Sequence, residues 1–362
     1  MDFDLSEDQI ALRDGAAALL DGMCSTVRVR AVAETDSGWD ADLWDAMVAQ
    51  GWLGVAVPEA DGGLGLGGVE LAVLLEQIGR HVAPVPVLAS AVAICALRAT
   101  GSASLVGELL EGKIKACVAW SRSSRAVRAE RSAEVWALTG RCDPVPFSPI
   151  ADIAIVWAED ADGAALFLVD LRELGRPNAQ PAMDLTRPIG WIELNGTSAE
   201  RIGGADGADA LLNMAAMACS AEMLGASSRA MEMAVEYAKE RVQFGRPIGS
   251  FQAVKHRCAD MLVDVEGMRS SSYWAAWCIE AADPDASIAA STAKIWCSDA
   301  SKRVMASALQ VHGGIGFTWE HDLHLFLKRA QLDQLSFGDA VFHRARLAAM
   351  LRTKVEAGES VL

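Results

Sequence analysis

The sequence predicts an α+β protein that is mostly α-helical and is built in three parts. Apolar residues recur at helical spacing in residues 1–113 and again in residues 206–362. Between them, residues 114–205 change to short apolar runs, several of them β-branched, which are typical of strands. No internal repeat is present, so the order helix, strand, helix indicates three domains with these boundaries.

The N-terminal part contains two clear helix signals. Ser6 and Gln9 form the sequence pattern of a capping box ahead of an amphipathic run. The proline- and glycine-rich segment 58–68 then interrupts helix formation. Apolar residues at helical spacing resume in residues 69–83, where they predict a further helix. We therefore expect residues 1–113 to form a helical domain.

The middle part contains apolar runs that are separated by Gly, Pro, Asp and Ser residues. This alternation is typical of strands joined by turns and predicts a small β domain. The runs are residues 114–120, 135–140, 153–158 and 165–171. Beyond this domain the chain returns to long segments rich in Ala, Met and Leu, which predict the C-terminal helices.

The composition indicates a protein that forms an oligomer. Of its 362 residues 52% are hydrophobic and 22% are charged, and the mean hydropathy is +0.20. This is apolar for a soluble monomer and suggests additional surface buried between subunits. No run approaches the roughly 20 apolar residues of a membrane span. The acidic start MDFDLSEDQ also lacks the features of a signal peptide, so we expect a cytoplasmic protein.

Charge and cysteine content argue against two other classes of site. The net charge is −16 and the pI is about 4.8, and the sequence lacks the clustered cations that nucleic-acid phosphates require. The eight cysteines are scattered, without a CxxC pair or a Cys/His set at zinc spacing. We expect them to be reduced and mostly buried.

The segment 240–261, ERVQFGRPIGSFQAVKHRCADM, carries candidate ligand-binding residues. Arg241 and Phe244 are three residues apart, so they are predicted to share one face of a helix that Gly245 and Pro247 then end. A guanidinium can hold a pyrophosphate group with two hydrogen bonds, and an aromatic ring can cover an adjacent apolar ring.

A second candidate lies about fifty residues further on, in QVHGGIGF over residues 310–317. Gln310 offers an amide group, and the turn at Gly313, Gly314 and Gly316 leaves room for the backbone to approach a phosphate. Taken singly, an arginine near a helix end or a GGxG sequence is more often a helix terminus than a binding site.

Together, the two segments resemble the C-terminal signature of the acyl-CoA dehydrogenase family, whose members are FAD enzymes. The resemblance implies the fold of that family, with an N-terminal helical domain, a middle β-barrel domain and a C-terminal four-helix bundle. It also implies residues that reach the FAD of a neighbouring subunit. These are Arg241, Phe244, Phe251, Gln252, Gln310, Val311, His312, Gly313 and Gly314. We expect the basic run 255–257 to be a solvated or interface face, with contact to a nucleotide as the alternative.

The family's two flavin-facing loops are altered in this sequence. One loop in the family resembles EPxAGSD, and the corresponding stretch 119–140 has neither its acidic-proline start nor the GSD. The other resembles WITNGxxAD, and this chain has PVPFSPIAD at 144–152, with Pro144 and Pro146 at the Trp and Thr positions. Proline has no backbone N–H to donate, so both changes weaken the side that would face the flavin ring.

The catalytic carboxylate of the family is also replaced. Dehydrogenation of an acyl-CoA requires a base close to the α-carbon. Counting from the GGxGF motif places Phe337 at the position of the usual Glu, and the alternative position in some relatives holds Ala215. Asp339 and Glu222 are the nearby carboxylates that could act instead, although each is more often a capping or surface residue.

The resemblance therefore predicts the non-catalytic subunit of a heteromeric, FAD-dependent acyl-CoA dehydrogenase. It extends to the actinobacterial FadE-type subunits of α2β2 steroid-CoA dehydrogenases, which implies a paralogous partner, a steroid side-chain CoA ester as substrate and an electron-transferring flavoprotein as acceptor. Three alternatives stay open: a homotetrameric enzyme that uses Asp339 or Glu222 as base, a flavin-dependent monooxygenase of the same fold, and a scaffold that binds nothing.

Overall fold

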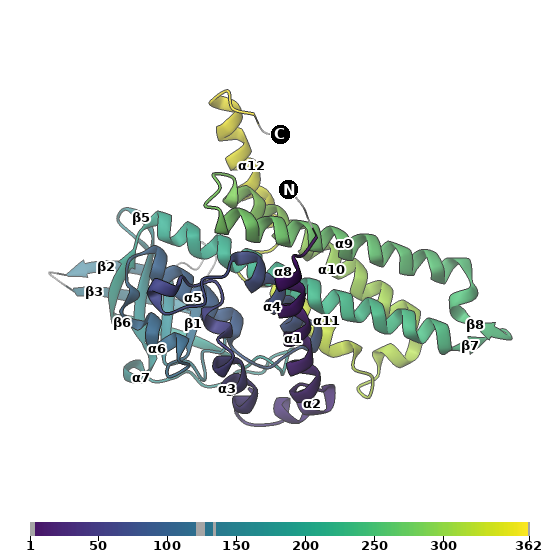
Figure 1. The fold of residues 1–362 in the computed structure, drawn as a ribbon. Coiled ribbons are helices and arrows are strands. Elements are labelled where there is room, and N and C mark those ends of the chain that lie inside the picture. Colours follow the sequence, from purple (N-terminus) through teal and green to yellow (C-terminus); the bar gives the residue numbers. More distant parts are fainter. Residues whose placement is uncertain (1–3, 121–126, 133–134, 361–362) are drawn as a thin grey trace. The chain divides into compact units, whose positions relative to one another are not determined.

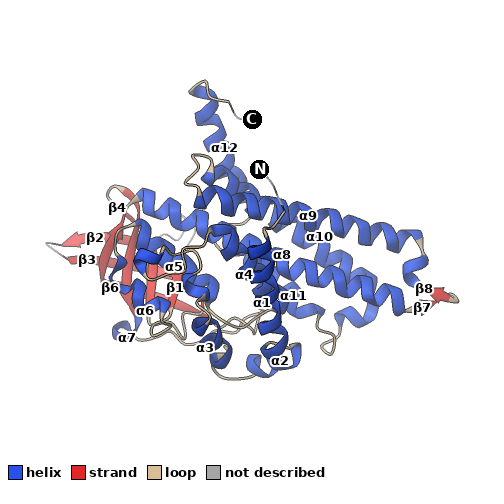
Figure 2. Cartoon of the chain, in the orientation of Figure 1, coloured by secondary structure: helices blue, strands red, loops and turns tan. Residues whose placement is uncertain are grey.

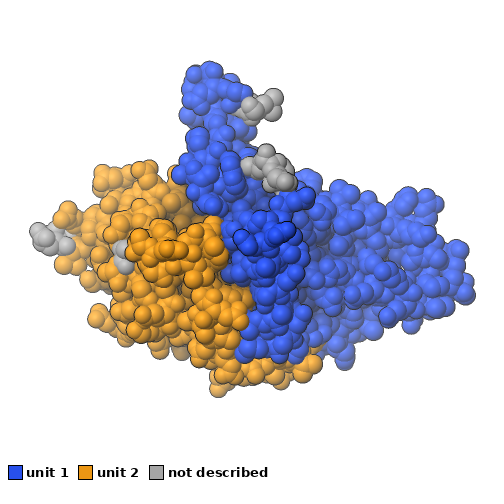
Figure 3. All heavy atoms as spheres, viewed as in Figure 1, with its two compact units in different colours: residues 1–26, 68–83, 216–362 blue, residues 27–67, 84–215 orange. Residues whose placement is uncertain are grey.

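The computed structural model describes residues 4–120, 127–132 and 135–360, and it contains the predicted order of helices, strands and helices (Figures 1 and 2). The chain packs into two compact units. One contains Met1–Thr26, Gly68–Ala83 and Ala216–Leu362, and the other contains Val27–Gly67 and Pro84–Ala215 (Figure 3). The boundaries predicted at 113 and 205 stay a prediction.

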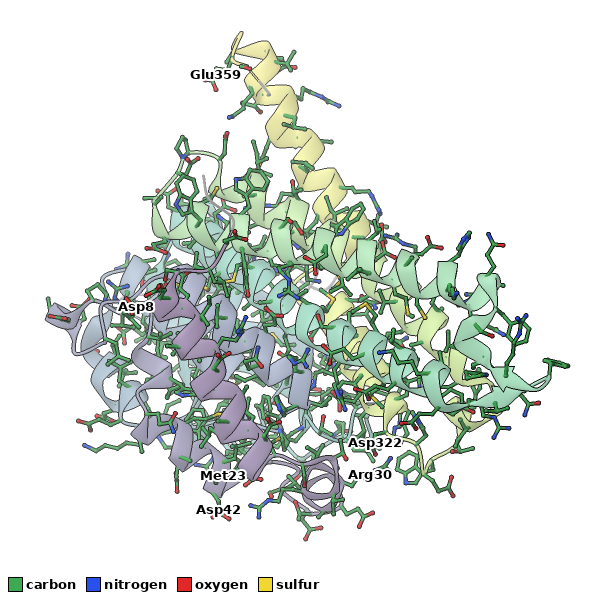
Figure 4. The ribbon with its side chains drawn as sticks, turned by 45° about the vertical axis from the view of Figure 1, so that its right-hand side comes forward. Asp8, Met23, Arg30, Asp42, Asp322 and Glu359 are labelled. Atoms are coloured by element: carbon green, nitrogen blue, oxygen red, sulfur yellow. The ribbon has the colours of Figure 1, made fainter. Side chains whose placement is uncertain are left out.

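The N-terminal part is helical, as the sequence predicts. Its helices are α1 (Glu7–Met23), α2 (Thr26–Ala33), α3 (Ala41–Ala49), α4 (Gly68–His81), α5 (Val87–Ala99) and α6 (Val106–Leu110). The capping box is confirmed, because the Ser6 hydroxyl accepts from the Gln9 backbone N–H at 3.2 Å and the Gln9 side chain accepts from the Ser6 N–H at 3.0 Å. Figure 4 marks the first turn of α1 by Asp8 and its end by Met23.

The middle part forms a β-barrel, which confirms the predicted architecture. Its strands are β1 (Ala116–Ala119), β2 (Val127–Ser132), β3 (Val135–Pro146), β4 (Ile153–Asp160), β5 (Gly163–Asp170) and β6 (Ile189–Gly203), with the short helix α7 (Leu171–Leu174) after β5. The strand order is β1-β4-β2-β3-β6-β5, and the sheet closes because β5 also pairs with β4. Buried side chains such as Leu138, Val156 and Phe167 fill the interior.

The C-terminal part is a bundle of long helices. They are α8 (Ala205–Glu240), α9 (Gln252–Glu280), α10 (Ala286–His312), α11 (Leu323–Leu335) and α12 (Ala340–Glu356). Small residues on α8, including many Ala and Ser, allow close packing of these helices. Among the described residues, none of the helices combines the length and the apolar character needed to cross a membrane.

Two glycines allow α4 and α8 to cross with their backbones in contact. A Cβ atom added to Gly79 would lie 2.0 Å from the Glu222 carbonyl oxygen, and one added to Gly225 would lie 1.8 Å from the Glu76 carbonyl oxygen. No side chain fits at either position, because real Cβ atoms do not approach an oxygen so closely. The crossing fixes α4 against the bundle helices.

Candidate functional site

The first candidate segment is a β-hairpin and not the end of a helix. Helix α8 ends at Glu240, and the chain reverses through β7 (Val242–Gln243) and β8 (Arg246–Pro247). The prediction that Arg241 and Phe244 share a helix face is therefore wrong. Phe244 and Gly245 have φ values of 55° and 78°, which fits a two-residue hairpin turn in which both central residues are left-handed.

The hairpin projects beyond the ends of α8 and α9 and carries exposed side chains (Figure 1). The Arg241 N–H donates to the Tyr237 carbonyl at 2.9 Å, and the Arg241 carbonyl accepts from the Ile248 N–H at 2.8 Å, so its backbone is fixed. Its guanidinium is exposed and forms no ion pair within the described residues. Phe244 is 91% exposed at the tip of the turn, which is unusual for a large apolar side chain.

Phe251 and Gln252 lie where the hairpin enters α9. The Phe251 ring packs edge-on against Phe244, with ring centroids 6.0 Å apart, and the Arg246 guanidinium lies over its face at 4.2 Å. Gln252 is exposed at the first residue of α9, and its amide lies 3.3 Å from the His256 Nε2 atom. The aromatic rings of the hairpin are thus ordered before any ligand arrives.

The second candidate segment is the C-terminal end of α10. Gln310 is exposed, whereas Val311 and His312 are buried, so their side chains do not face a ligand. Gly313 has a φ of 62° and begins a short 3-10 helix, Gly313–Phe317. A Cβ atom at Gly313 or Gly314 would meet nothing within 4 Å, so open space lies beside this backbone.

His312 connects the two segments. Its ring stacks on Tyr237 of α8 at 4.9 Å and contacts His321 at 4.5 Å, and its Nδ1 hydrogen-bonds with the Ala308 carbonyl at 2.8 Å. Burial lowers the pKa of His312, which favours a neutral ring at neutral pH. Because Tyr237 lies one helical turn before Arg241, the structure brings the hairpin and the Gly313–Gly314 turn to the same end of the bundle.

These residues fit an FAD molecule. Residues 239–257 contain five Lys or Arg residues and one carboxylate, in a chain with a net charge of −16. The cations suit a pyrophosphate group, the exposed Phe244 suits an apolar ring, and the open space beside Gly313 and Gly314 leaves room for a ligand to approach the backbone. The site assignment stays a prediction for all nine residues.

Phe337, the predicted position of the usual base, lies in a tightly held turn between α11 and α12. Phe337 has a φ of 53° and is buried, and Gly338 follows with a φ of 94°. The fully buried Lys294 ammonium donates to the carbonyls of Asp333, Gln334 and Gly338 at 2.8–3.0 Å. An ammonium has three N–H donors, so these contacts use all of them. Sequence reasoning missed Lys294, although a lysine within an Ala- and Ser-rich helix is a signal for such a role.

The two alternative carboxylates both have structural partners. Asp339 is the N-cap of α12, and its side chain accepts from the Phe342 N–H at 2.9 Å. Glu222 forms an ion pair with Arg329 at 2.6 Å, and both side chains are 0% exposed. Ala215 is also fully buried in α8. A carboxylate sealed in this way is poorly placed to remove a proton from a substrate.

The two segments that were compared with the family's flavin-facing loops lie in the β-barrel. Pro144 and Pro146 belong to β3, next to an irregularity in its pairing with β6 between Cys142 and Val145. Proline is tolerated in strands at such irregularities, because no ladder hydrogen bond is lost there. Of the stretch 119–140, residues 121–126 and 133–134 lie outside the described residues.

Comparison with known proteins identifies the family to which this fold belongs. The descriptions "Acyl-CoA dehydrogenase, N-terminal domain" and "Acyl-CoA dehydrogenase, C-terminal domain" match residues 6–115 and 203–351. Acyl-CoA dehydrogenase IpdE2 of Mycolicibacterium smegmatis is 35% identical over 327 residues, which cover 90% of this chain and 93% of that protein. The chain belongs to the acyl-CoA dehydrogenase family.

Similar proteins from actinobacteria extend over almost the whole chain. Acyl-CoA dehydrogenase FadE27 of Mycobacterium tuberculosis is 33% identical over 376 residues, covering 97% of this chain and 99% of that protein. The ChsE4-ChsE5 complex from the same organism contains a chain with a TM-score of 0.91 and 33% identity, at 97% and 99% coverage. A variant of the Tcur3481-Tcur3483 steroid ACAD has a TM-score of 0.90 and 31% identity, at the same coverage.

Proposed function

We propose that this chain is the non-catalytic subunit of a heteromeric, FAD-dependent acyl-CoA dehydrogenase with an α2β2 arrangement. The proposal rests on the residues at the two positions where members of the family have their catalytic carboxylate. Counting from the family's motifs places Phe337 and Ala215 at these positions. Of the two carboxylates that could act instead, Asp339 caps a helix and Glu222 is buried in an ion pair. Meanwhile the hairpin and the Gly313–Gly314 turn present cationic, aromatic and open backbone groups to solvent.

Each part of this chain's half-site has a distinct role in the proposed complex. FAD, when bound, would supply the hydride acceptor for the β-carbon of an acyl-CoA, and a carboxylate of the partner would be the base for the α-proton. Arg241 would hold the pyrophosphate, and Phe244 would cover an apolar ring of the cofactor. The Tyr237–His312 stack holds the Gly313 backbone in position beside them.

The similar proteins support both a partner and a substrate class. Two solved structures that this chain resembles are complexes of two named proteins, and the name of one includes the word steroid. We propose a paralogue of the same fold as partner and a steroid side-chain CoA ester as substrate. Family resemblance further favours an electron-transferring flavoprotein as acceptor. The buried Glu222–Arg329 pair disfavours a homomeric enzyme that uses Glu222 as its base.

Flavin content and native mass test the proposal. The chain is purified alone and after co-expression with candidate paralogues, and FAD is quantified per chain. We expect little flavin in the isolated chain and one FAD per heterodimer in an α2β2 complex. One FAD per chain in an active homotetramer would overturn it. In the complex, Arg241→Gln should lower FAD content, whereas Arg352→Gln, which removes an exposed cation from α12, should leave it unchanged.

A further inference from the structure

The hairpin carries a second arginine that the sequence reasoning did not select. In its ladder Gln243 pairs with Arg246 and Val242 pairs with Pro247, and the Ile248 N–H donates to the Arg241 carbonyl. Cross-strand partners lie on one side of a ladder, and so do residues two apart along a strand. Arg246 therefore lies on the same side of the hairpin as Gln243 and Arg241.

Arg241 lies one residue before β7, and the bond from the Ile248 N–H to its carbonyl extends the hydrogen-bond pattern of the hairpin by one residue. If the ladder geometry also extends to it, Arg241 and Arg246 are diagonal neighbours about 7–8 Å apart, a distance that two long side chains can span to reach one pyrophosphate group. Neither guanidinium forms an ion pair among the described residues, although the exposed carboxylate of Glu240 lies next to Arg241 in the chain. The hairpin thus presents two cations on one face without a counter-charge.

Arg246 is also held in a defined orientation. Its guanidinium lies over the Phe251 ring at 4.2 Å, and the same ring makes an edge-to-face contact with Phe244. Stacking through the flat face of a guanidinium leaves the N–H groups at its rim free to donate. Because the side chain is ordered in advance, less conformational entropy is lost when it binds an anion.

We propose that Arg246 is a second pyrophosphate-binding residue, which acts together with Arg241 on the FAD that the partner subunit holds. This inference rests on the proposed function. The competing explanation is structural: Arg246 could serve only to pack against Phe251. A methionine at position 246 keeps an unbranched apolar side chain against the ring but removes the charge and the donors, so Arg246→Met separates the two roles.

The test uses the co-expressed complex, freed of flavin and titrated with FAD, with ADP as a competitor that carries the pyrophosphate but no flavin ring. Arg246→Met should raise the Kd for both FAD and ADP by roughly tenfold or more, as expected for the loss of a charge-assisted hydrogen bond. Arg246→Lys should give a smaller rise, because the charge stays and the paired donors are lost. The Tm of the isolated Arg246→Met chain should match that of the wild type.

The variants Arg241→Gln and Arg352→Gln make the outcomes distinguishable. If Arg241→Gln raises the Kd for FAD but Arg246→Met has the same Kd as the control Arg352→Gln, the role of Arg246 is overturned and the proposed function stands. A loss of FAD affinity for Arg246→Met that leaves ADP affinity intact, or that comes with a lowered Tm, would show a packing role and would also overturn it. FAD affinity unaffected by either arginine would instead overturn the proposed function.

Discussion

At the scale of single residues, Phe244 combines two unfavourable features. It is 91% exposed, and its φ of 55° lies in the left-handed region that large side chains avoid. Stability alone would favour Asn at this place, since Asn-Gly is the preferred pair for such a hairpin turn. An exposed, strained aromatic residue is therefore best explained by a contact that the isolated chain lacks.

We predict that Phe244→Asn stabilises the isolated chain and lowers the affinity of the complex for FAD. The gain in the free energy of unfolding should be about 1 kcal/mol, because Asn adopts the left-handed conformation more easily. Denaturant unfolding of the chain and FAD content of the co-purified complex measure the two effects. Phe244→Tyr is the control that keeps the ring. A variant that loses stability, or that retains full FAD content, would contradict the prediction.

His343 gives the chain a pH-dependent stability. It is buried beside Lys294, its Nε2 hydrogen-bonds with the Phe337 carbonyl at 3.0 Å, and burial lowers its pKa to about 3. The unfolded chain binds a proton to this residue below a pH of about 6.5, whereas the folded chain does not. The contribution of His343 to the free energy of unfolding should therefore be fully present above that pH and should be lost as the pH falls toward 3.

We predict that His343 contributes about 2 kcal/mol to the loss of stability between pH 7.5 and pH 5. The free energy of unfolding of the wild type and of His343→Gln is measured at both pH values. The variant has no imidazole to protonate, so its change between the two pH values should be smaller by that amount, whatever its absolute stability. Equal changes in both proteins would show that His343 does not titrate differently on folding.

At the scale of elements, the sequence predicted those whose signals are local. The capping box at Ser6, the helix over 69–83 and the four apolar runs of the barrel are all present. Strands β2 and β6 are not among the predicted runs. The sequence VRAERS of β2 has no apolar run, and this strand is held by pairing with β3 and β4. The hairpin at Arg241 was predicted as helix because the spacing of Arg241 and Phe244 suits a helix face, while the turn residues Phe244 and Gly245 decide the structure.

The candidate site was predictable only as far as its residue types. The sequence selected the cationic and glycine-rich segments, but it gave no sign that the Tyr237–His312 stack joins them. It also left Asp339 and Glu222 open as bases, because the sequence offered a capping role only as an alternative and gave no sign of the buried ion pair between Glu222 and Arg329. Contacts between residues far apart in the chain set these roles, and no local pattern records them.

The crossing of α4 and α8 allows a test with a matched control. We predict that Gly225→Ala destabilises the chain by about 3 kcal/mol or more, because its Cβ would lie 1.8 Å from the Glu76 carbonyl and the helices must separate. Gly15→Ala in α1 meets nothing within 4 Å and should stabilise by about 0.5–1 kcal/mol. Thermal or denaturant unfolding measures both. Effects of the same sign would show that the crossing tolerates a methyl group.

At the scale of the whole molecule, exposed apolar residues gather at the end of the bundle that carries the half-site. Phe244 is 91% exposed, Phe317 is 77% exposed and Trp319 is 57% exposed. The first two lie in or directly beside the two candidate segments. Large exposed apolar groups near a binding site are typical of an interaction surface. Together with the mean hydropathy of +0.20, they are consistent with the partner surface proposed above.

We predict that the chain gains stability in two separable steps, first from the partner and then from FAD. A ligand that binds only the folded complex at a hundred times its Kd adds about 2.7 kcal/mol, which should raise the Tm by a few degrees. In the wild-type complex both steps should be present. In the Arg241→Gln complex the increase in Tm caused by the partner should remain, because the apolar surface is intact. The increase caused by FAD should be smaller. Thermal unfolding of the isolated chain and of both complexes, with and without FAD, measures the two increases.

If FAD raises the Tm of the isolated chain as much as that of the complex, this chain binds FAD without a partner. The proposal that it supplies only part of an FAD site would then have to be abandoned.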